Sequence, residues 1–191
     1  EYKITSVDKK AEALCQKRWD SIAKPLHSLG KLETLLIQIA GLTGNPDIDF
    51  SRRALVAMCA DNGVVEEGVT QTGQEVTAIV AENFLKGDTS VCAMCRQCNV
   101  LVYPVDTGMV TDTKVRTDLK VMKGTHNMAK GPAMTREEAI RGIMAGVTAA
   151  AELKAKGYQI LATGEMGIGK QCCGFCAPGS ACRNHDRQRC R

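Results

Sequence analysis

Three short apolar runs alternate with segments of helical periodicity, and this alternation constrains the fold of the chain more than any other feature. The runs cover Arg53 to Ala60, Val100 to Val105 and Tyr158 to Ala162. Their length and apolar character are typical of strands that are buried on both faces of a parallel sheet. Strands that alternate with helices predict an α/β fold with a doubly wound, mostly parallel sheet and helices on both of its faces.

Apolar residues at helical spacing predict five helices around these strands. The expected helices cover Val7 to Trp19, Ser28 to Ala40, Gln74 to Leu85, Asp88 to Gln97 and Thr135 to Ala150, and one more extended piece is expected between Lys114 and Met122. Gly41 and Gly44 are expected to stop the second helix, and Asp88 to cap the fourth. Thr135 and Glu138 have the spacing of a capping box for the fifth.

Functional residues in such folds lie at the carboxyl ends of the strands, and this rule selects three loops. The loops run from Asp61 to Gln74, from Asp106 onward, and from Thr163 to Gly169. In the last one, Gly164 to Gly169 form a glycine-rich turn whose unobstructed N–H groups suit a phosphate, although such a turn is often only a connection. Glu165 inside the turn suits a hydroxyl, a cationic ring or a proton better than a phosphate.

Composition indicates a globular chain of about one domain. Of its 191 residues 44% are hydrophobic, and its longest apolar stretches are far shorter than the ~20 residues of a membrane span. The net charge of +4 lies entirely in residues 170–191, so it does not indicate nucleic acid as a partner. No secretory leader opens the chain, so we expect a cytoplasmic protein without a membrane partner.

Cysteine spacing offers two metal hypotheses. Residues 170–191 hold five of the ten cysteines, and Cys173, Cys176, Cys182 and His185 are chemically suited to Zn²⁺, although the loop between the two pairs is very short. The other group is Cys92, Cys95 and Cys98, which have the spacing of an iron–sulfur run. No fourth Cys-Pro follows them, so we expect buried small residues on a helix and no metal.

Six strings of this sequence together resemble one enzyme family. They are KPLHSLGKLE (24–33), ADNGVVEEGVTQTGQEVT (60–77), NFLKGDTSV (83–91), VDTG (105–108), GTHNMAKGPAMTREEA (124–139) and LATGEMGIG (161–169). In order and spacing they are similar to the nicotinate-nucleotide:dimethylbenzimidazole phosphoribosyltransferases, from Lys24 to Gly169.

The resemblance implies a fold and an activity. The fold is a Rossmann-like large domain with a small domain of N- and C-terminal helices, assembled as a homodimer. The reaction transfers phosphoribosyl from nicotinate mononucleotide to a benzimidazole-type base, with inversion, and gives the α-ribotide of the cobalamin lower ligand without a cofactor. We expect residues 1–50 to be the N-terminal part of the small domain and residues 51–169 to be an incomplete α/β domain.

The resemblance also implies the residues of the site. Thr70 and Gln74 match the segment that binds the base, and Glu165 matches an assisting carboxylate at the reaction centre. The ribose-phosphate segment matches Gly164, Met166, Gly167 and Gly169, and Asp61 and Asp106 are further candidates. The principal general base of the family is a glutamate near its C-terminus, which the 191 residues do not reach, so we expect little activity from them alone.

Four positions depart from the family pattern. Asn62 stands where the family has histidine, His126 where it has arginine, Gly73 where it has proline, and His27 where it has glycine. Asn62 cannot titrate, His126 lacks a permanent charge, and Gly73 loosens the base pocket. An altered preference among bases is the expected consequence.

Residues 170–191 depart from the family altogether. If codons for residues 170–191 are read from the second base of the Lys170 codon, they can encode the peptide N-[NS]-AAAFALLGQPVETMTGRGAG without a stop. This peptide resembles the continuation of the family sequence. We therefore expect these residues to be an out-of-frame tail that ends a truncated chain. The alternatives are a zinc-binding tail and a non-catalytic protein that keeps the ligand pocket.

Overall fold

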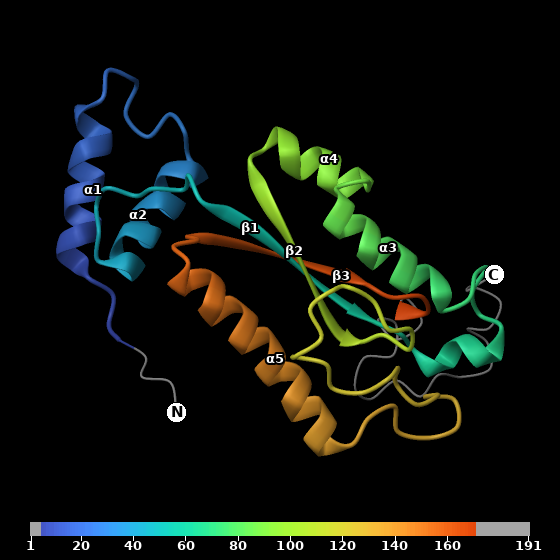
Figure 1. Ribbon diagram of the computed structural model, residues 1–191. Coiled ribbons are helices and arrows are strands. Elements are labelled where there is room, and N and C mark those ends of the chain that lie inside the picture. Colours follow the sequence, from blue (N-terminus) through green and yellow to red (C-terminus); the bar gives the residue numbers. More distant parts are fainter. Residues whose placement is uncertain (1–4, 171–191) are drawn as a thin grey trace. The chain divides into compact units, whose positions relative to one another are not determined.

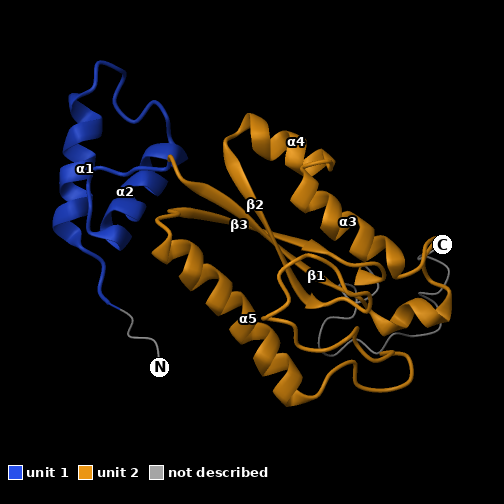
Figure 2. Ribbon diagram, in the orientation of Figure 1, with its two compact units in different colours: residues 1–50 blue, residues 51–191 orange. Residues whose placement is uncertain are grey.

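Two compact units, residues 1–50 and 51–191, make up the chain (Figure 2). The computed structural model describes residues 5–170. The residues of the expected out-of-frame tail from 171 on, including Cys173, Cys176, Cys182 and His185 of the zinc hypothesis, lie outside the described part. No helix within residues 5–170 is long and apolar enough to cross a membrane.

The first unit contains two helices, α1 (Lys9–Ser21) and α2 (Lys31–Thr43). Asp8 caps α1 by accepting hydrogen bonds from two backbone N–H groups of its first turn. Gly41 does not stop α2 as expected, because the helix continues to a left-handed Gly44. A Cβ at Gly41 would lie 2.6 Å from side-chain atoms of Val7 and Glu12, so this glycine allows close packing.

The second unit is built on a three-stranded parallel sheet. Its strands are β1 (Arg53–Ala60), β2 (Val100–Gly108) and β3 (Ile160–Met166), in the order β2-β1-β3 (Figure 1). Both pairings are parallel, and Arg53 lies opposite Val100 on one side and Ile160 on the other. The prediction that the three apolar runs form adjacent parallel strands is confirmed.

Helices cover both faces of this sheet, as predicted. They are α3 (Glu75–Lys86), α4 (Ser90–Gln97) and α5 (Arg136–Ala155). On one face Ala54 and Val56 pack with Ala149 and Leu153 of α5. On the other face Cys59 packs with Ala81 of α3, and Figure 1 shows α5 on the side of the sheet opposite α3 and α4. Successive side chains of β1 point to opposite faces of the sheet, so this strand contributes to one hydrophobic core on each face.

Two strands extend further than expected. β2 continues to Gly108 instead of ending at Val105, and β3 covers Gly164, Glu165 and Met166, which we expected in a turn. Both strands follow β1 to its end, since Cys59 pairs with Asp106 and with Met166. The glycine-rich turn is therefore shorter and begins at Gly167.

Two local expectations need correction. Thr89, not Asp88, caps α4, because the Thr89 side chain accepts the N–H of Cys92. The segment from Lys114 to Met122 forms no strand, only an isolated bridge between Val105 and Arg116. A 3₁₀-helix (Gly63–Glu67) lies in the loop after β1. The capping box of α5 is confirmed.

Candidate functional site

The carboxyl ends of the three strands bring the selected loops to one edge of the sheet. β1 ends at Ala60, β2 at Gly108 and β3 at Met166. Because all three strands run in the same direction, the loops from Asp61, from Met109 and from Gly167 all leave the sheet at that edge. We call this edge the carboxyl rim.

A chain of hydrogen bonds joins the first of these loops to the third. The Nε2 of Gln74 donates to the backbone carbonyl of Asn62 at 3.0 Å, and the Nδ2 of Asn62 donates to the carbonyl of Ile168 at 2.9 Å. The N–H of Ile168 in turn donates to the Oγ1 of Thr77 at 3.2 Å. Ile168 is thus held at its carbonyl by the loop after β1 and at its N–H by the first turn of α3.

Glycine is required in the turn that is held in this way. A Cβ at Gly167 would overlap the carbonyl oxygen of Ala60, and Gly169 has a φ of +85°. A side chain at Gly169 would also press on Val64 and Val65, with contacts of 3.1–3.3 Å. The glycines of the predicted ribose-phosphate segment therefore allow the turn to lie directly on the loop after β1.

Glu165 is an exposed carboxylate at this end of β3. It lies opposite Met58 of β1, its side chain is 61% exposed, and it forms an ion pair with Lys170. Its strand neighbours Gly164 and Met166 are half-buried. A carboxylate in this position can accept a proton from a ligand that binds at the carboxyl rim.

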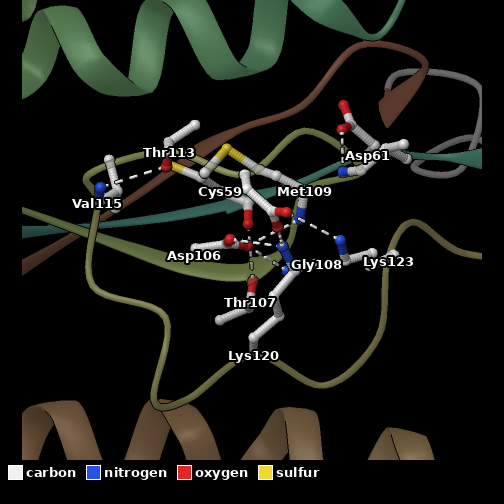
Figure 3. Close-up of polar contacts among 12 residues, drawn as sticks. Cys59, Asp61, Asp106, Thr107, Gly108, Met109, Thr113, Val115, Lys120 and Lys123 are labelled. Atoms are coloured by element: carbon white, nitrogen blue, oxygen red, sulfur yellow. Dashed lines mark hydrogen bonds and ion pairs between the residues drawn. The ribbon is translucent and has the colours of Figure 1, made fainter.

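Asp61 is buried, and its carboxylate is hydrogen-bonded to the backbone of the loop that follows β2. Its Oδ2 accepts the N–H of Val110 at 2.8 Å, and its own N–H donates to the carbonyl of Gly108 at 2.9 Å. The other carboxylate oxygen, Oδ1, is buried and has no hydrogen-bond partner in the described structure. Asp61 thus ties the ends of β1 and β2 together, as Figure 3 shows.

Asp106 is also completely buried and organises the same loop (Figure 3). Its Oδ1 accepts the N–H groups of Gly108 and Met109 at 2.9 and 2.8 Å. Its Oδ2 lies 2.9 Å from the Nζ of Lys120, and Lys120 also lies 3.6 Å from Asp112. These contacts are those of a structural anchor beneath the carboxyl rim.

Cys59 lies between these groups in the core. Burial, together with the negative charge of Asp106, raises the pKa of its thiol to about 12. At neutral pH the thiol is protonated, so Cys59 is no nucleophile.

A polar cluster beside the rim was missed by sequence reasoning. Asn127 donates to Glu67 at 2.8 Å and Lys130 forms an ion pair with Glu66 at 2.8 Å, which lowers the pKa of Glu66 and raises that of Lys130. Glu66, Asn127 and Lys130 border a cavity of about 380 Å³ together with His126. His126 was singled out in the sequence only because it departs from the family pattern. Asn127 and Lys130 lie about sixty residues from their acidic partners, Glu67 and Glu66, and no local sequence signal links them.

Thr70 lies in the loop before α3, where its hydroxyl donates to the carbonyl of Thr72 at 2.8 Å. This bond shapes the turn that leads to Gln74. The structure thus places Thr70 and Gln74 in the segment that leads into α3, Glu165 at the end of β3, and Gly167 and Gly169 in the turn that follows. Asp61 and Asp106 are buried at the ends of β1 and β2. Their roles toward a ligand stay predictions.

The described cysteines suggest no metal centre. Within residues 5–170 no group of three or more histidine, cysteine or acidic side chains is arranged to hold a metal ion. Cys92 and Cys95 are buried on α4, as expected for small packing residues. Cys98, the C-cap residue of α4, is exposed, contrary to the expectation.

Comparison with known proteins gives one consistent result. The sequence profile of a family described as "Phosphoribosyltransferase" matches residues 4–177. The nicotinate-nucleotide–dimethylbenzimidazole phosphoribosyltransferase of Acetivibrio thermocellus is 46% identical over 158 residues, which are 82% of this chain and 45% of that protein. The enzyme of the same name from Ruminiclostridium cellulolyticum is 47% identical over 81% of this chain and 44% of its own length.

Solved structures agree with this result. The crystal structure of CobT from Thermus thermophilus matches with a TM-score of 0.75 at 40% identity, over 84% of this chain and 49% of that one. A structure of the nicotinate-nucleotide–dimethylbenzimidazole phosphoribosyltransferase of the same organism matches with a TM-score of 0.76. The chain spans about half the length of the relatives that it matches.

Proposed function

Because this chain belongs to the nicotinate-nucleotide–dimethylbenzimidazole phosphoribosyltransferase family, we propose that it takes part in the transfer of phosphoribosyl from nicotinate mononucleotide to a benzimidazole-type base. The product is the α-ribotide of the cobalamin lower ligand. The carboxyl rim is the proposed site. The observation that supports this most is the chain of hydrogen bonds from Gln74 through Asn62 to Ile168, since it couples the proposed base segment to the proposed ribose-phosphate segment.

Positioning is the main contribution of these two segments. Two reactants held in a productive geometry react as if at very high local concentration. A loop that is already ordered by hydrogen bonds loses less conformational entropy on binding. Gln74 cannot move without disturbing Asn62, and Asn62 cannot move without releasing Ile168. We propose that this coupling sets the distance between the incoming base and the anomeric carbon.

The glycine turn is the proposed phosphate anchor. Glycine amides can approach an anion closely because no Cβ intervenes. The N–H of Ile168 is engaged by Thr77, so the phosphate takes the N–H groups of the neighbouring glycines, Gly167 and Gly169.

The chemistry itself requires little further assistance. The ring nitrogen of nicotinate is cationic while it is bonded to ribose, so nicotinate departs as a neutral pyridine ring with its carboxylate. The attacking azole nitrogen bonds to the anomeric carbon, and the second azole nitrogen loses its proton to a carboxylate. We propose Glu165 as an assisting acceptor, with Lys170 as the ion-pair partner that gives way when a ligand binds.

Asn62 and Gly73 adapt the base pocket. In place of a titratable histidine, Asn62 supplies a neutral amide that is engaged with Ile168. Gly73, in place of proline, leaves more freedom in the backbone before Gln74. We propose that this site accepts bases other than 5,6-dimethylbenzimidazole, including other benzimidazoles and phenols.

The remaining features of the whole protein follow the family resemblance. We propose a homodimer that acts in the cytoplasm on small molecules and uses no cofactor. Residues 1–50 are proposed to belong to a small helical domain and residues 51–169 to the α/β phosphoribosyltransferase domain. The α/β fold of the described residues supports the second of these assignments.

Ligand titration followed by product analysis tests the proposed function. The purified chain is titrated with nicotinate mononucleotide and with 5,6-dimethylbenzimidazole, and α-ribotide is then quantified by chromatography beside the full-length Acetivibrio thermocellus relative. We expect binding of both ligands, and turnover about 10²–10⁴-fold below that of the relative, because no residue of this chain matches the family's principal base. Failure to bind either ligand would overturn the proposal. Binding without any product would indicate a non-catalytic ligand-binding protein.

A further inference from the structure

A second cavity lies at the opposite end of the sheet, where the strands begin. It has a volume of about 430 Å³ and is bordered by residues around the starts of β1 and β2, the end of α4 and Tyr158. In Figure 1 α4 leads directly into the start of β2. β1 is eight residues long, so this cavity is roughly 25 Å from the carboxyl rim and separate from the proposed site.

Three arginines border this cavity: Arg52, Arg53 and Arg96. Its lining, which belongs wholly to the described residues, includes no aspartate or glutamate. Residues 1–169 contain twenty basic and twenty acidic side chains, so the chain has no general excess of positive charge to explain this grouping. The positive field at the cavity is therefore local.

None of these arginines forms an ion pair within residues 5–170. Arg52 stacks its guanidinium on the ring of Tyr158 at 4.8 Å from the centroid. Arg96 makes one long hydrogen bond, 3.5 Å, to the carbonyl of Gly87. The guanidinium groups are held in place but their charge is not neutralised by a carboxylate.

Arg53 supplies the most specific observation. It occupies the first position of β1, and the alternation through Leu55 and Ala57 to Cys59 directs its side chain to the face of α3 and α4. Its Nε is buried and has no hydrogen-bond partner in the described structure. A buried donor without an acceptor is costly, and an oxyanion in the cavity would supply one.

From this geometry we infer that the cavity binds a dianionic oxyanion of the phosphate class, such as the phosphate of a small monoester. Arginine presents parallel N–H donors that match phosphate oxygens two at a time. Asn99, which also borders the cavity, adds a neutral donor. The ring of Tyr158 and the side chain of Leu101 offer an apolar wall for the organic part of a monoester.

A structural explanation of the arginines competes with this one. The C-terminal ends of α4 and α5 lie near the starts of the strands, and each helix end has a partial negative charge of roughly half an elementary charge. Arginines can serve to compensate it. That explanation requires no ligand, and it predicts that phosphate has no more effect on these side chains than chloride at equal ionic strength.

Arginine side-chain NMR separates the two explanations. The whole chain, labelled with ¹⁵N, is titrated with inorganic phosphate at constant ionic strength, and the Nε–Hε resonances are followed; substitution of each arginine assigns its signal. We expect the Arg53 resonance to shift in a saturable manner with phosphate and not with chloride. An Arg53 resonance that does not move, or that moves equally with chloride, would overturn the inference.

Substitutions extend the test. Arg53→Lys retains the charge but removes the planar guanidinium with its parallel N–H donors. Arg96→Gln removes a charge from an exposed residue that borders the cavity. We expect about a 10-fold weaker phosphate affinity for the first and several-fold for the second, consistent with the loss of charge-assisted hydrogen bonds. Arg141→Gln, which removes an exposed charge from α5, should leave the affinity unchanged. Equal losses in Arg96→Gln and Arg141→Gln would show that phosphate binding does not depend on the cavity.

Discussion

The side-chain amide of Asn62 donates a hydrogen bond of 2.9 Å to the backbone carbonyl of Ile168, a residue 106 positions later in the chain. This contact joins the loop after β1 to the turn after β3. The same loop holds Gln74, whose amide is bonded to the backbone of Asn62. Hydrogen bonds through Asn62 therefore connect the proposed base segment to the proposed phosphate segment.

Asn62→Ala should weaken the binding of nicotinate mononucleotide by about 5- to 10-fold, since a hydrogen bond that orders the turn contributes about 1 kcal/mol. Asn83→Ala on α3 is the matched control, because it makes the same substitution away from the turn. Calorimetric titration of both variants measures the effect. Equal affinities in the two would show that the turn does not need this contact.

Gly167→Ala should destabilise the fold by about 1–3 kcal/mol or more, because the added Cβ would overlap the carbonyl oxygen of Ala60. Gly142→Ala is the matched control: nothing lies within 4 Å of its added Cβ, and this glycine is inside α5. There the same substitution should stabilise by about 0.5–1 kcal/mol. Urea unfolding of the two variants should move the midpoint in opposite directions.

Asp106→Asn should destabilise by about 3–5 kcal/mol, because Lys120 would keep its charge inside the fold without its partner. Asp112→Asn provides the contrast. Its side chain is 78% exposed, and an exposed ion pair contributes only about 0–1 kcal/mol. Similar unfolding midpoints for the two variants would contradict the anchoring role of Asp106.

The Arg116 network predicts how stability depends on pH. Arg116 donates to Asp118 and Glu152, and these hydrogen bonds hold the pKa of both carboxylates below their ordinary values. A lowered pKa stabilises the fold above the unfolded-state value, so this contribution should be complete above pH ~5 and lost as the pH falls below ~4.

Arg116→Gln should therefore flatten the fall in stability between neutral and acidic pH, while Arg136→Gln on the exposed start of α5 should not. Thermal unfolding across this pH range measures the difference. Parallel profiles for wild type and Arg116→Gln would show that the network makes no pH-dependent contribution.

The sequence allowed the sheet to be predicted because each strand is an apolar run, and β1 was placed with its observed ends. The ends of β2 and β3 were misplaced because Asp106, Gly164 and Glu165 are polar or lack a side chain. Such residues favour turns in isolation. In the protein, pairing with the end of β1 outweighs that preference.

The candidate site was predictable only in part. Loops at strand ends can be selected from topology, and the family strings named Gln74 and Glu165. The contacts that give the site its geometry join distant residues, such as Asn62 with Ile168 and Asn127 with Glu67. No periodicity or spacing in the sequence indicates which of many amides will meet which carbonyl.

The most direct test of the account is the affinity of this chain for 5,6-dimethylbenzimidazole in wild type, Gln74→Ala and Gln97→Ala. Gln97 is the exposed last residue of α4, so its substitution controls for the chemistry of the change. If the carboxyl rim binds the base, Gln74→Ala should weaken binding about 10-fold and Gln97→Ala should leave it unchanged. Equal affinities for all three proteins would contradict the assignment of the base site.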